Sequence, residues 1–527
     1  MSLQPSAFSL SSALPAPRAA IQGKCSPFAG DEVSCRMIWF RSIVLALVVI
    51  AGGGAWGLGI AHRGYDYDEV QRAHSIWMTS QGLLPYQDFF ECHPPYFALL
   101  APLVRGYTDP VALLVTLRLV AALGNLLFLA GLATVAAISS GSSRLVAILG
   151  TALVAFHPAV LVFLEEFRID GWGYALATWS IMWFLRSRRA GRHMGFGIGT
   201  GIATLFFCPK LALFPPMILV FEQVRAQASS KTALLAFVKY IIGVGVAGGL
   251  FWCWLAANGI SLNLAFACLV NYNSLSNFHS AFGHGLLREM VKLPTLSLPI
   301  LAAFVIWMIH CIRARSVPGA YPAALALWLA AQATLVSYPY KQYYGPWFLF
   351  ASGFLAFSYP AWEGFTKHAA NGVFFGLCGL SISASVATAS IGMNSHPSQD
   401  QGNFLRTLNE VTDPEDRIVT VPPLHPIFRR DTFYVWFNTL DPAGYETEKI
   451  MEGMPLVRDL VSAQHYREEL KAHPPVLVVL WDDTFYPRRQ KTVLDEFLQE
   501  RGYVLSMIGN VPVAIRPDRF VRKPALD

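Results

Sequence analysis

The chain has 527 residues, of which 54% are hydrophobic and only 14% are charged, and its mean hydropathy is +0.42. This composition excludes an ordinary soluble globular protein and indicates a membrane protein. The net charge of +6 resides in the connections between apolar stretches, so it predicts no binding of nucleic acid.

The first 36 residues are rich in Ser, Ala and Pro and lack a long apolar core. We therefore expect residues 1–36 to form a disordered cytoplasmic leader and not a cleavable signal peptide. The eight cysteines of the chain include no close pair and no cluster with histidine at zinc-site spacing, which argues against a disulfide framework or a structural metal site.

Residues 37–392 contain apolar stretches suited to crossing a membrane. A transmembrane helix needs roughly 20 apolar residues, and about 11 stretches are candidates. They cover approximately residues 37–60, 111–138, 145–164, 171–185, 195–208, 211–222, 234–257, 295–312, 319–337, 344–360 and 370–391. The fifth and sixth are short and could form one broken hairpin around Pro209 and Lys210. The pattern predicts an all-α polytopic membrane domain.

Lysine and arginine occur in every second connection between these stretches. They are Arg36, Arg41, Arg144, Arg186, Arg188, Arg189, Arg192, Arg225, Lys231, Arg313, Arg315 and Lys367. Because positive residues resist translocation, this alternation predicts a cytoplasmic N-terminus and an extracytoplasmic C-terminus. We expect a multi-pass protein of a bacterial inner membrane.

The first extracytoplasmic loop, residues 62–110, is rich in acidic residues. They are Asp66, Asp68, Glu69, Asp88, Glu91 and Asp109. The apolar run Tyr96–Val104, which follows Pro94-Pro95, is too short to span a membrane, so we expect a re-entrant or interfacial segment. The loop is therefore predicted to fold against the membrane surface.

Residues 393–527 have the mixed polarity of a small soluble α/β domain. The expected strands are Arg417–Val421, Val476–Leu480, Val504–Ile508 and Val511–Ile515, and the expected helices are 402–411, 447–472 and 491–501. Gly509-Asn510 suits a tight turn between the last two strands. No glycine-rich phosphate loop follows a strand, so no nucleotide site is predicted. His425, Arg429 and Arg430 are expected at the surface of this domain.

The order of residues in the first loop is characteristic. Tyr-Asp-Tyr-Asp-Glu from Tyr65 is followed by a helix to Gln81 and then by Gly-Leu-Leu-Pro-Tyr-Gln-Asp-Phe-Phe-Glu-Cys-His-Pro-Pro-Tyr. This loop resembles the GT-C superfamily of membrane glycosyltransferases, in particular the protein mannosyltransferases and aminoarabinose transferases. Those proteins share an Asp-Glu pair beyond the first span and a Pro-Tyr-x-Asp-Phe-Phe-Glu-x-His-Pro-Pro type of segment. The likeness covers about residues 60–360 and includes Arg168-Ile-Asp170, Lys210 and the segment 338–346.

The resemblance implies an inverting transfer of a sugar from a polyprenyl-phosphate donor to an acceptor at the extracytoplasmic face. The acceptor could be a lipid, a glycan or a protein, and the surrounding partners are membrane lipids. Asp68 is the candidate base, because an acceptor hydroxyl needs a carboxylate to remove its proton. Glu69 and Glu91 complete the expected catalytic group, with Glu69 bracing the loop. Alternatively, Asp68 caps a helix that begins at Glu69 and pairs with Arg72.

The resemblance also implies contacts with the donor phosphate and sugar. The candidate residues are His93, Arg168, Asp170, Lys210, Lys341 and Tyr344. Relatives often have lysine where this chain has Cys92, so His93 or Lys341 would supply the contact to phosphate. The alternatives are a structural hydrogen bond for His93, and an interfacial position for the lysines and tyrosines. A divalent metal held by Asp68, Glu91 and a histidine stays open, although no ligand spacing supports it, and no other cofactor is predicted.

Two other functions remain to be weighed. A transporter or flippase for a lipid-linked or soluble solute would share the many spans, but transporters concentrate ionisable groups near the middle of the membrane, often in two related halves. A non-catalytic subunit for assembly or polymer export would use the terminal domain for binding. The acidic outer loop favours the transferase.

Overall fold

The computed structural model describes residues 31–89, 91–141, 144–187, 189, 191–272, 290–314, 319–335, 344–363, 367–395, 397–420, 424–430, 463–480 and 488–520. The chain divides into two compact units, Met1–Leu47 and Val48–Asp527. Helix α1 (Asp31–His62) begins in the first unit and ends in the second, so the last residues of the expected leader are helical. The remaining features all belong to the second unit.

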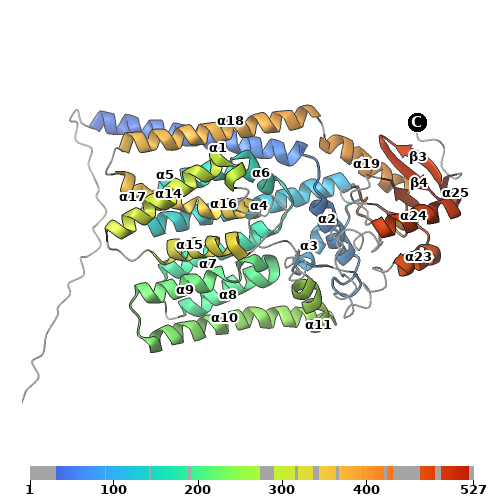
Figure 1. Ribbon diagram of the computed structural model, residues 1–527, viewed down its shortest axis with the longest axis horizontal. Coiled ribbons are helices and arrows are strands. Elements are labelled where there is room, and N and C mark those ends of the chain that lie inside the picture. Colours follow the sequence, from blue (N-terminus) through green and yellow to red (C-terminus); the bar gives the residue numbers. More distant parts are fainter. Residues whose placement is uncertain are drawn as a thin grey trace, which may run out of the picture. The chain divides into compact units, whose positions relative to one another are not determined.

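The apolar stretches predicted from the sequence lie in helices (Figure 1). After the first loop come α4 (Pro110–Ser140), α5 (Arg144–Ala155), α6 (Pro158–Glu165), α7 (Asp170–Arg186), α8 (Arg192–Ile202), the π-helix η1 (Ala203–Phe207), the 3-10 turn η2 (Pro209–Leu211), α9 (Phe214–Arg225), α10 (Ser230–Ala257), α11 (Leu262–Phe266), the π-helix η3 (Ala267–Tyr272), α14 (Pro294–Arg313), α15 (Ala320–Leu335), α16 (Tyr344–Ala351), α17 (Gly353–Glu363) and α18 (Lys367–Ser395). The predicted helical character of this region is confirmed.

Among the described residues, three helices are long and apolar enough to cross a membrane unbroken, namely α4, α10 and α14. Two further pairs of helices would each count as one span if the pair is a single broken helix. Ala46–His62 and Tyr67–Ser80 are bent by 68° at their junction, and α5 and α6 are bent by 85°. The sequence predicts one span over 145–164, whereas in the structure a new helix begins at Pro158, which cannot continue the hydrogen bonding of α5. The predicted number of about 11 spans therefore stays a prediction.

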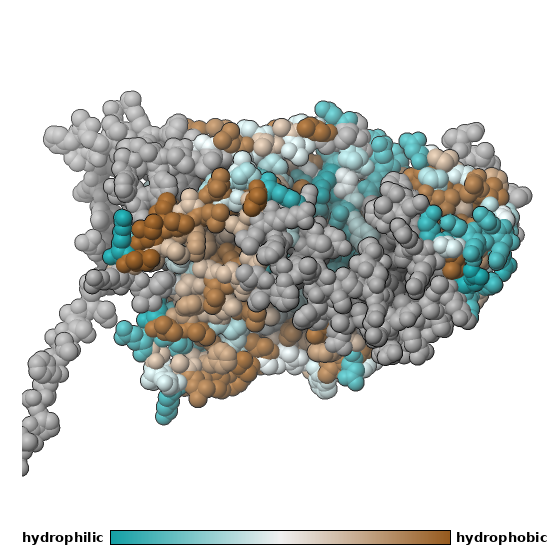
Figure 2. All heavy atoms as spheres, viewed as in Figure 1, coloured by the Kyte–Doolittle hydropathy of each residue, from teal (hydrophilic) through white to brown (hydrophobic). Residues whose placement is uncertain are grey.

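Helix α10 exposes a continuous apolar surface. Leu234, Leu235, Val238, Ile241 and Ile242 are each 45% to 65% exposed. Figure 2 shows hydrophobic residues gathered on this side of the molecule. Apolar patches of this size are unfavourable in water but are what a helix presents to lipid.

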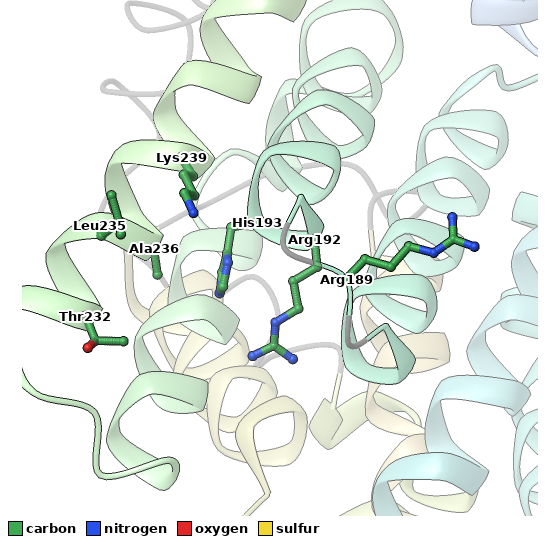
Figure 3. A pocket seen from close by; sticks show the side chains of 7 residues that line it. All are labelled: Arg189, Arg192, His193, Thr232, Leu235, Ala236 and Lys239. Atoms are coloured by element: carbon green, nitrogen blue, oxygen red, sulfur yellow. The ribbon is translucent and has the colours of Figure 1, made fainter.

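Helices α8 and α10 pack against each other through glycine. A Cβ atom at Gly197 would lie 2.2 Å from the carbonyl oxygen of Tyr240, and one at Gly243 would lie 2.2 Å from the carbonyl oxygen of Met194. Only small residues allow two helix backbones to approach so closely. Beside this crossing, the first turns of the two helices border a pocket of about 350 Å³ (Figure 3).

The first loop contains two short helices, α2 (Tyr67–Ser80) and α3 (Phe97–Val104). Helix α2 has 14 residues, too few to cross a membrane alone. Helix α3 covers the predicted interfacial segment, burying Phe97 and Leu100 in a shared apolar core while Leu99 and Leu103 are 58% and 49% exposed. An apolar outer face suits contact with lipid, and the interfacial position stays a prediction.

The terminal region combines a small sheet with helices. Its elements are α19 (Pro397–Val411), β1 (Ile418–Val419), α23 (Ala463–Ala472), β2 (Leu477–Val479), α24 (Arg488–Glu500), β3 (Val504–Ile508), β4 (Val511–Ile515) and α25 (Pro517–Phe520). The strand order is β1-β2-β4-β3, with β1 and β2 parallel and the other pairs antiparallel. The sequence predicts β3 and β4 with their observed bounds, and Gly509 takes the positive φ (+58°) that their turn requires.

The sheet is covered on both faces, because successive side chains of each strand point to opposite faces. Val478 packs with Phe497 of α24, whereas Leu477 and Val479 pack with Leu408 of α19. The predicted helix over 491–501 is α24, and the predicted helix over 447–472 is described only from residue 463.

The segment 424–430 leaves the sheet and enters the apolar core of the first loop. Ile427 and Phe428 belong to that core. The distance between Nδ1 of His74, on α2, and the carbonyl oxygen of Ile427 is 2.6 Å. His425 and Arg429 are 0% and 1% exposed, so their predicted surface position is wrong. The cause is that this segment is a connection between two parts of the molecule and not an outer edge of the sheet. Arg430 is exposed as expected.

Candidate active site

The start of helix α2 fixes the positions of three acidic residues. Asp66 is the N-cap, with extended backbone (φ −78°, ψ 158°), and its amide donates to Oε2 of Glu69 at 2.8 Å. The alternative in which Asp68 caps a helix that begins at Glu69 is therefore wrong, since the helix begins two residues earlier, at Tyr67. The Asp68 side chain is thus left for other contacts.

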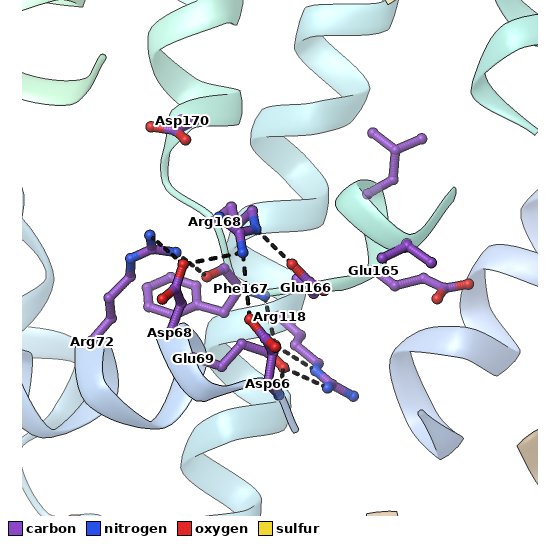
Figure 4. Close-up of polar contacts among 12 residues, drawn as sticks. Asp66, Asp68, Glu69, Arg72, Arg118, Glu165, Glu166, Phe167, Arg168 and Asp170 are labelled. Atoms are coloured by element: carbon purple, nitrogen blue, oxygen red, sulfur yellow. Dashed lines mark hydrogen bonds and ion pairs between the residues drawn. The ribbon is translucent and has the colours of Figure 1, made fainter. Parts of the chain in front are cut away.

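Glu69 is a fully buried brace. Its Oε1 accepts from Nε of Arg118 and from the amide of Phe167, both at 2.7 Å, and its Oε2 accepts from Nη2 of Arg118 at 2.7 Å (Figure 4). The Arg118 and Glu69 side chains are 0% and 1% exposed. A carboxylate surrounded by four protein donors, counting Asp66, holds neighbouring segments together and has little freedom to accept a proton from a substrate.

Arg118, on α4, joins this brace to the end of α1. Its guanidinium also donates to the carbonyl oxygens of Ile60, Arg63 and Gly64, each at 2.9 Å, and lies 4.6 Å from the ring centre of Tyr65. No motif in the sequence marks Arg118 as a site residue. An arginine within an apolar helix is itself a signal, because such a charge needs a buried partner.

Asp68 lies between two arginines. Its Oδ2 is 3.2 Å from Nη2 of Arg72, one helical turn away as predicted, and 3.1 Å from Nη2 of Arg168. Burial by itself would raise the pKa of Asp68, but Arg72 and Arg168, with His93 and Lys210 further off, outweigh it and lower the pKa to about 2. Asp68 is therefore ionised at neutral pH.

Asp66 has the opposite electrostatic environment. Burial, together with the neighbouring Glu166 and Asp68 carboxylates, raises the pKa of Asp66 to about 6, although Arg168 lies 3.4 Å away. Arg168 in turn pairs with Glu166 at 2.6 Å. Arg168 thus connects the α6–α7 segment to both aspartates of α2.

Glu91 and His93 form a second ion pair before α3. Oε1 of Glu91 lies 2.6 Å from Nδ1 of His93, and Oε2 accepts from the hydroxyl of Ser75 at 2.8 Å. Burial opposes a charged imidazole, but the Cys92 sulfur and the Glu91 carboxylate outweigh it and raise the pKa of His93 to about 10. Nε2 of His93 lies 3.4 Å from Nη2 of Arg72, and the imidazole also interacts electrostatically with Asp68.

Asp170 and Lys210 approach from the other side. Asp170 is the first residue of α7, and Lys210 lies in η2, where Cys208 breaks the helical conformation with φ −145° and ψ 89°. Nζ of Lys210 is 3.6 Å from Oδ2 of Asp170. Asp170 also interacts electrostatically with Arg72, Arg168 and His93.

We name the resulting group the charged cluster, with members Asp68, Arg72, His93, Arg168, Asp170 and Lys210. The structure brings together five of the candidate residues from four separate segments, with Glu91 holding His93 and Glu69 holding the loop. Lys341 lies outside the described residues. Tyr344 is buried at the start of α16, where its ring lies 5.4 Å from that of Trp347, and its role stays a prediction.

One group within the described residues could hold a metal ion. Glu91, Cys92 and His93 each offer one ligand atom, and these atoms lie within 4.8 Å of one another. Carboxylate, thiolate and imidazole are suitable zinc ligands. A metal bound there through Nδ1 would have to replace the contact between Glu91 and His93. The site thus differs from the predicted set of Asp68, Glu91 and a histidine.

No family model matches the chain, and no curated protein is similar to it in sequence. Crystal structures of similar fold include two of one protein. ArnT from Cupriavidus metallidurans in the apo state is 13% identical, with a TM-score of 0.60 over 91% of this chain and 99% of that one. The same protein bound to undecaprenyl phosphate is 14% identical, with a TM-score of 0.59 over 90% and 98%. The chain therefore has the same overall fold as ArnT, which agrees with the fold that the resemblance of the first loop predicts.

Proposed function

We propose that this chain is an inverting membrane glycosyltransferase. It transfers a sugar from a polyprenyl-phosphate donor to a lipid, glycan or protein acceptor at the extracytoplasmic face of a bacterial inner membrane. The observation that carries the proposal is the charged cluster, in which one ionised carboxylate, Asp68, lies among cations at the start of α2. The ArnT fold and its structure with undecaprenyl phosphate support a lipid-linked donor.

The chemistry follows from the charges. The acceptor hydroxyl gives its proton to the Asp68 carboxylate while its oxygen attacks the anomeric carbon, and the bond from that carbon to the phosphate oxygen breaks. The electron pair of the broken bond stays on the phosphate, which leaves with increased negative charge. His93, Lys210 and Arg72 are fixed cations that stabilise this charge.

The pairing of Asp68 with two arginines regulates its basicity. With a pKa of about 2 the carboxylate is a weak base. An anionic donor attracts Arg72 and Arg168 to its own phosphate, which weakens their hold on Asp68 and raises its affinity for a proton. Binding of the donor therefore prepares the base. Glu69 and Arg118 act by positioning α2, and Glu91 by keeping His93 charged.

The proposed topology places residues 37–392 in the membrane and residues 393–527 on the extracytoplasmic side, together with the first loop. The two outer parts are in contact. Oε1 of Gln401 accepts from the amide of Tyr65 at 2.6 Å, and Arg406 forms two hydrogen bonds to Asp109, at 3.0 and 3.1 Å. Two parts that touch in this way lie on the same side of a membrane. This contact supports the topology inferred from the alternation of positive residues, in which both parts are extracytoplasmic.

The test is transfer activity in reconstituted membranes. The donor is the polyprenyl-phosphate sugar that accumulates when the gene is deleted, identified by mass spectrometry of the lipid extract. We expect Asp68→Asn to lower the transfer rate by about 10² to 10⁴, the range of a lost general base. Asp88→Asn is the matched control, because Asp88 lies in the same loop and caps a turn through the amide of Leu84.

The Asp68→Asn protein must still be monodisperse and bind the donor for the result to count. Turnover at the wild-type rate would remove Asp68 as the base. Movement of a labelled solute across the membrane without any glycosylated product would replace the transferase by a transporter.

A further inference from the structure

The pocket at the first turns of α8 and α10 lies outside the charged cluster. Its lining residues are Arg189, Arg192, His193, Thr232, Leu235, Ala236 and Lys239. Figure 3 shows His193 between Lys239 and Arg192, whereas the guanidinium of Arg189 points away from the other side chains. The polar part of the pocket therefore consists mainly of two cations, an imidazole and the hydroxyl of Thr232.

Lys239 is unusual because it is half-buried between Val238 and Tyr240 on an apolar helix. Among the residues that the structure describes, no carboxylate pairs with it. Nε2 of His193 is likewise buried without a hydrogen-bond partner in the described part of the chain. Arg192 is only weakly neutralised, since its Nη2 lies 3.9 Å from Oε1 of Glu222. Together these groups leave positive charge and hydrogen-bonding capacity for an anion.

The apolar surroundings of the pocket indicate what carries that anion. Leu235 lines the pocket and is 52% exposed, and Leu234, Val238 and Ile242 continue the exposed apolar surface along α10. A phosphate group in the pocket would thus have an acyl-chain surface beside it. A free phosphate ion would use only the polar half of this arrangement.

The pocket is far from the charged cluster. Trp254, near the other end of α10, contacts Tyr86 of the first loop with 6.4 Å between ring centroids. Lys239 and Trp254 are 15 residues apart, which is about 22 Å along a helix at 1.5 Å per residue. The pocket and the first loop therefore lie toward opposite ends of a helix long enough to cross a membrane.

We propose that this pocket binds the headgroup of an anionic phospholipid in the leaflet opposite the first loop, with an acyl chain along the exposed face of α10. The phosphate lies against Lys239, Arg192 and His193. Basic pockets between helices on the cytoplasmic side of membrane proteins are suited to such headgroups. The basic residues of the neighbouring connections place this end of α10 in the cytoplasmic leaflet.

The experiment measures binding of palmitoyl-oleoyl phosphatidylglycerol to the full-length purified protein by native mass spectrometry, with the phosphatidylcholine of the same chains as the neutral reference. We expect the wild type to retain phosphatidylglycerol in preference to phosphatidylcholine. Lys239→Met should weaken this binding about fivefold, the effect of one cation at a membrane surface, while Lys239→Arg should keep it. Lys231→Met is the matched control, because Lys231 lies on the same helix, is exposed and does not line the pocket.

Lys239→Met removes an unpaired charge from an apolar helix, so we expect the protein to fold as well as the wild type, which its melting temperature in neutral lipid checks. If the variant is unstable, Arg192→Gln gives the same comparison. Equal loss in the Lys231 and Lys239 variants, or equal retention of the two wild-type lipids, would overturn the proposal. Displacement of phosphatidylglycerol by millimolar glycerol 3-phosphate would also overturn it, because the pocket would then be a site for a soluble anion.

Discussion

The first loop and the terminal region are stabilised by different interactions, although α19 and the segment 424–430 of the terminal region contact the first loop. The central ion pair of the first loop, between Glu69 and Arg118 of α4, is buried, with side chains 1% and 0% exposed. In the terminal region the apolar core lies on the two faces of the sheet, and pairs such as Lys491 with Asp495 lie at the surface, 33% and 49% exposed. Burying charged side chains costs free energy. In the first loop the buried ion pair fixes the position of α2, which carries Asp68 of the charged cluster.

The largest effect that sharpens this comparison is the loss of one buried partner. Arg118→Met leaves the Glu69 carboxylate buried without its cation, and we expect a loss of about 3 to 5 kcal/mol of unfolding free energy. The double variant Arg118→Met with Glu69→Met should recover part of this loss, because no uncompensated charge remains. Chemical unfolding in detergent micelles measures both.

Arg406→Met is the matched control for this experiment. Arg406 also forms a paired contact with a carboxylate of the first loop, Asp109, but the two side chains are 45% and 39% exposed. We expect a loss of at most about 1 kcal/mol there. Similar losses for Arg118 and Arg406 would mean that burial does not distinguish the two kinds of ion pair.

Buried contacts of this kind also mark the limit of the sequence analysis. The pair of Asp68 with Arg72 follows from helical spacing, and β3 and β4 follow from alternation and their turn residues. The partner of Glu69 does not follow, because Arg118 is 49 residues away and only the fold brings them together. Three acidic residues within four positions compete for the N-cap, and propensity alone does not select Asp66 over Asp68.

The second effect concerns the segment that joins the two regions. His425 is fully buried, and its ring lies 4.3 Å from that of His74 and near Arg429. Burial, with these two neighbours, holds the pKa of His425 well below its usual range. The unfolded chain binds a proton below about pH 6.5 and the folded chain does not, so stability present above this pH is lost as the pH falls.

We expect this loss to reach about 1.4 kcal/mol per pH unit below pH 6.5. Thermal unfolding of the wild type and of His425→Phe, compared between pH 7.5 and 5.5, isolates the contribution of His425 together with its contact to His74, because groups remote from this contact titrate alike in both proteins. The raised pKa of Asp66 stabilises the folded protein as the pH falls below about 6. This contribution is the same in both proteins and cancels in the difference. Parallel pH profiles for the two proteins would show that His425 is protonated in the folded state.

The smallest effect is expected at the surface of the terminal region. Nζ of Lys491 lies 3.4 Å from Oδ2 of Asp495, one turn further along α24. Such a pair contributes about 0.3 to 0.5 kcal/mol, because water and salt screen both charges. Lys491→Met should therefore change the unfolding free energy by at most about 0.5 kcal/mol, and 1 M salt should abolish even this difference. A loss as large as that of Arg118→Met would mean that charge, and not the apolar faces of its sheet, also holds the terminal region together.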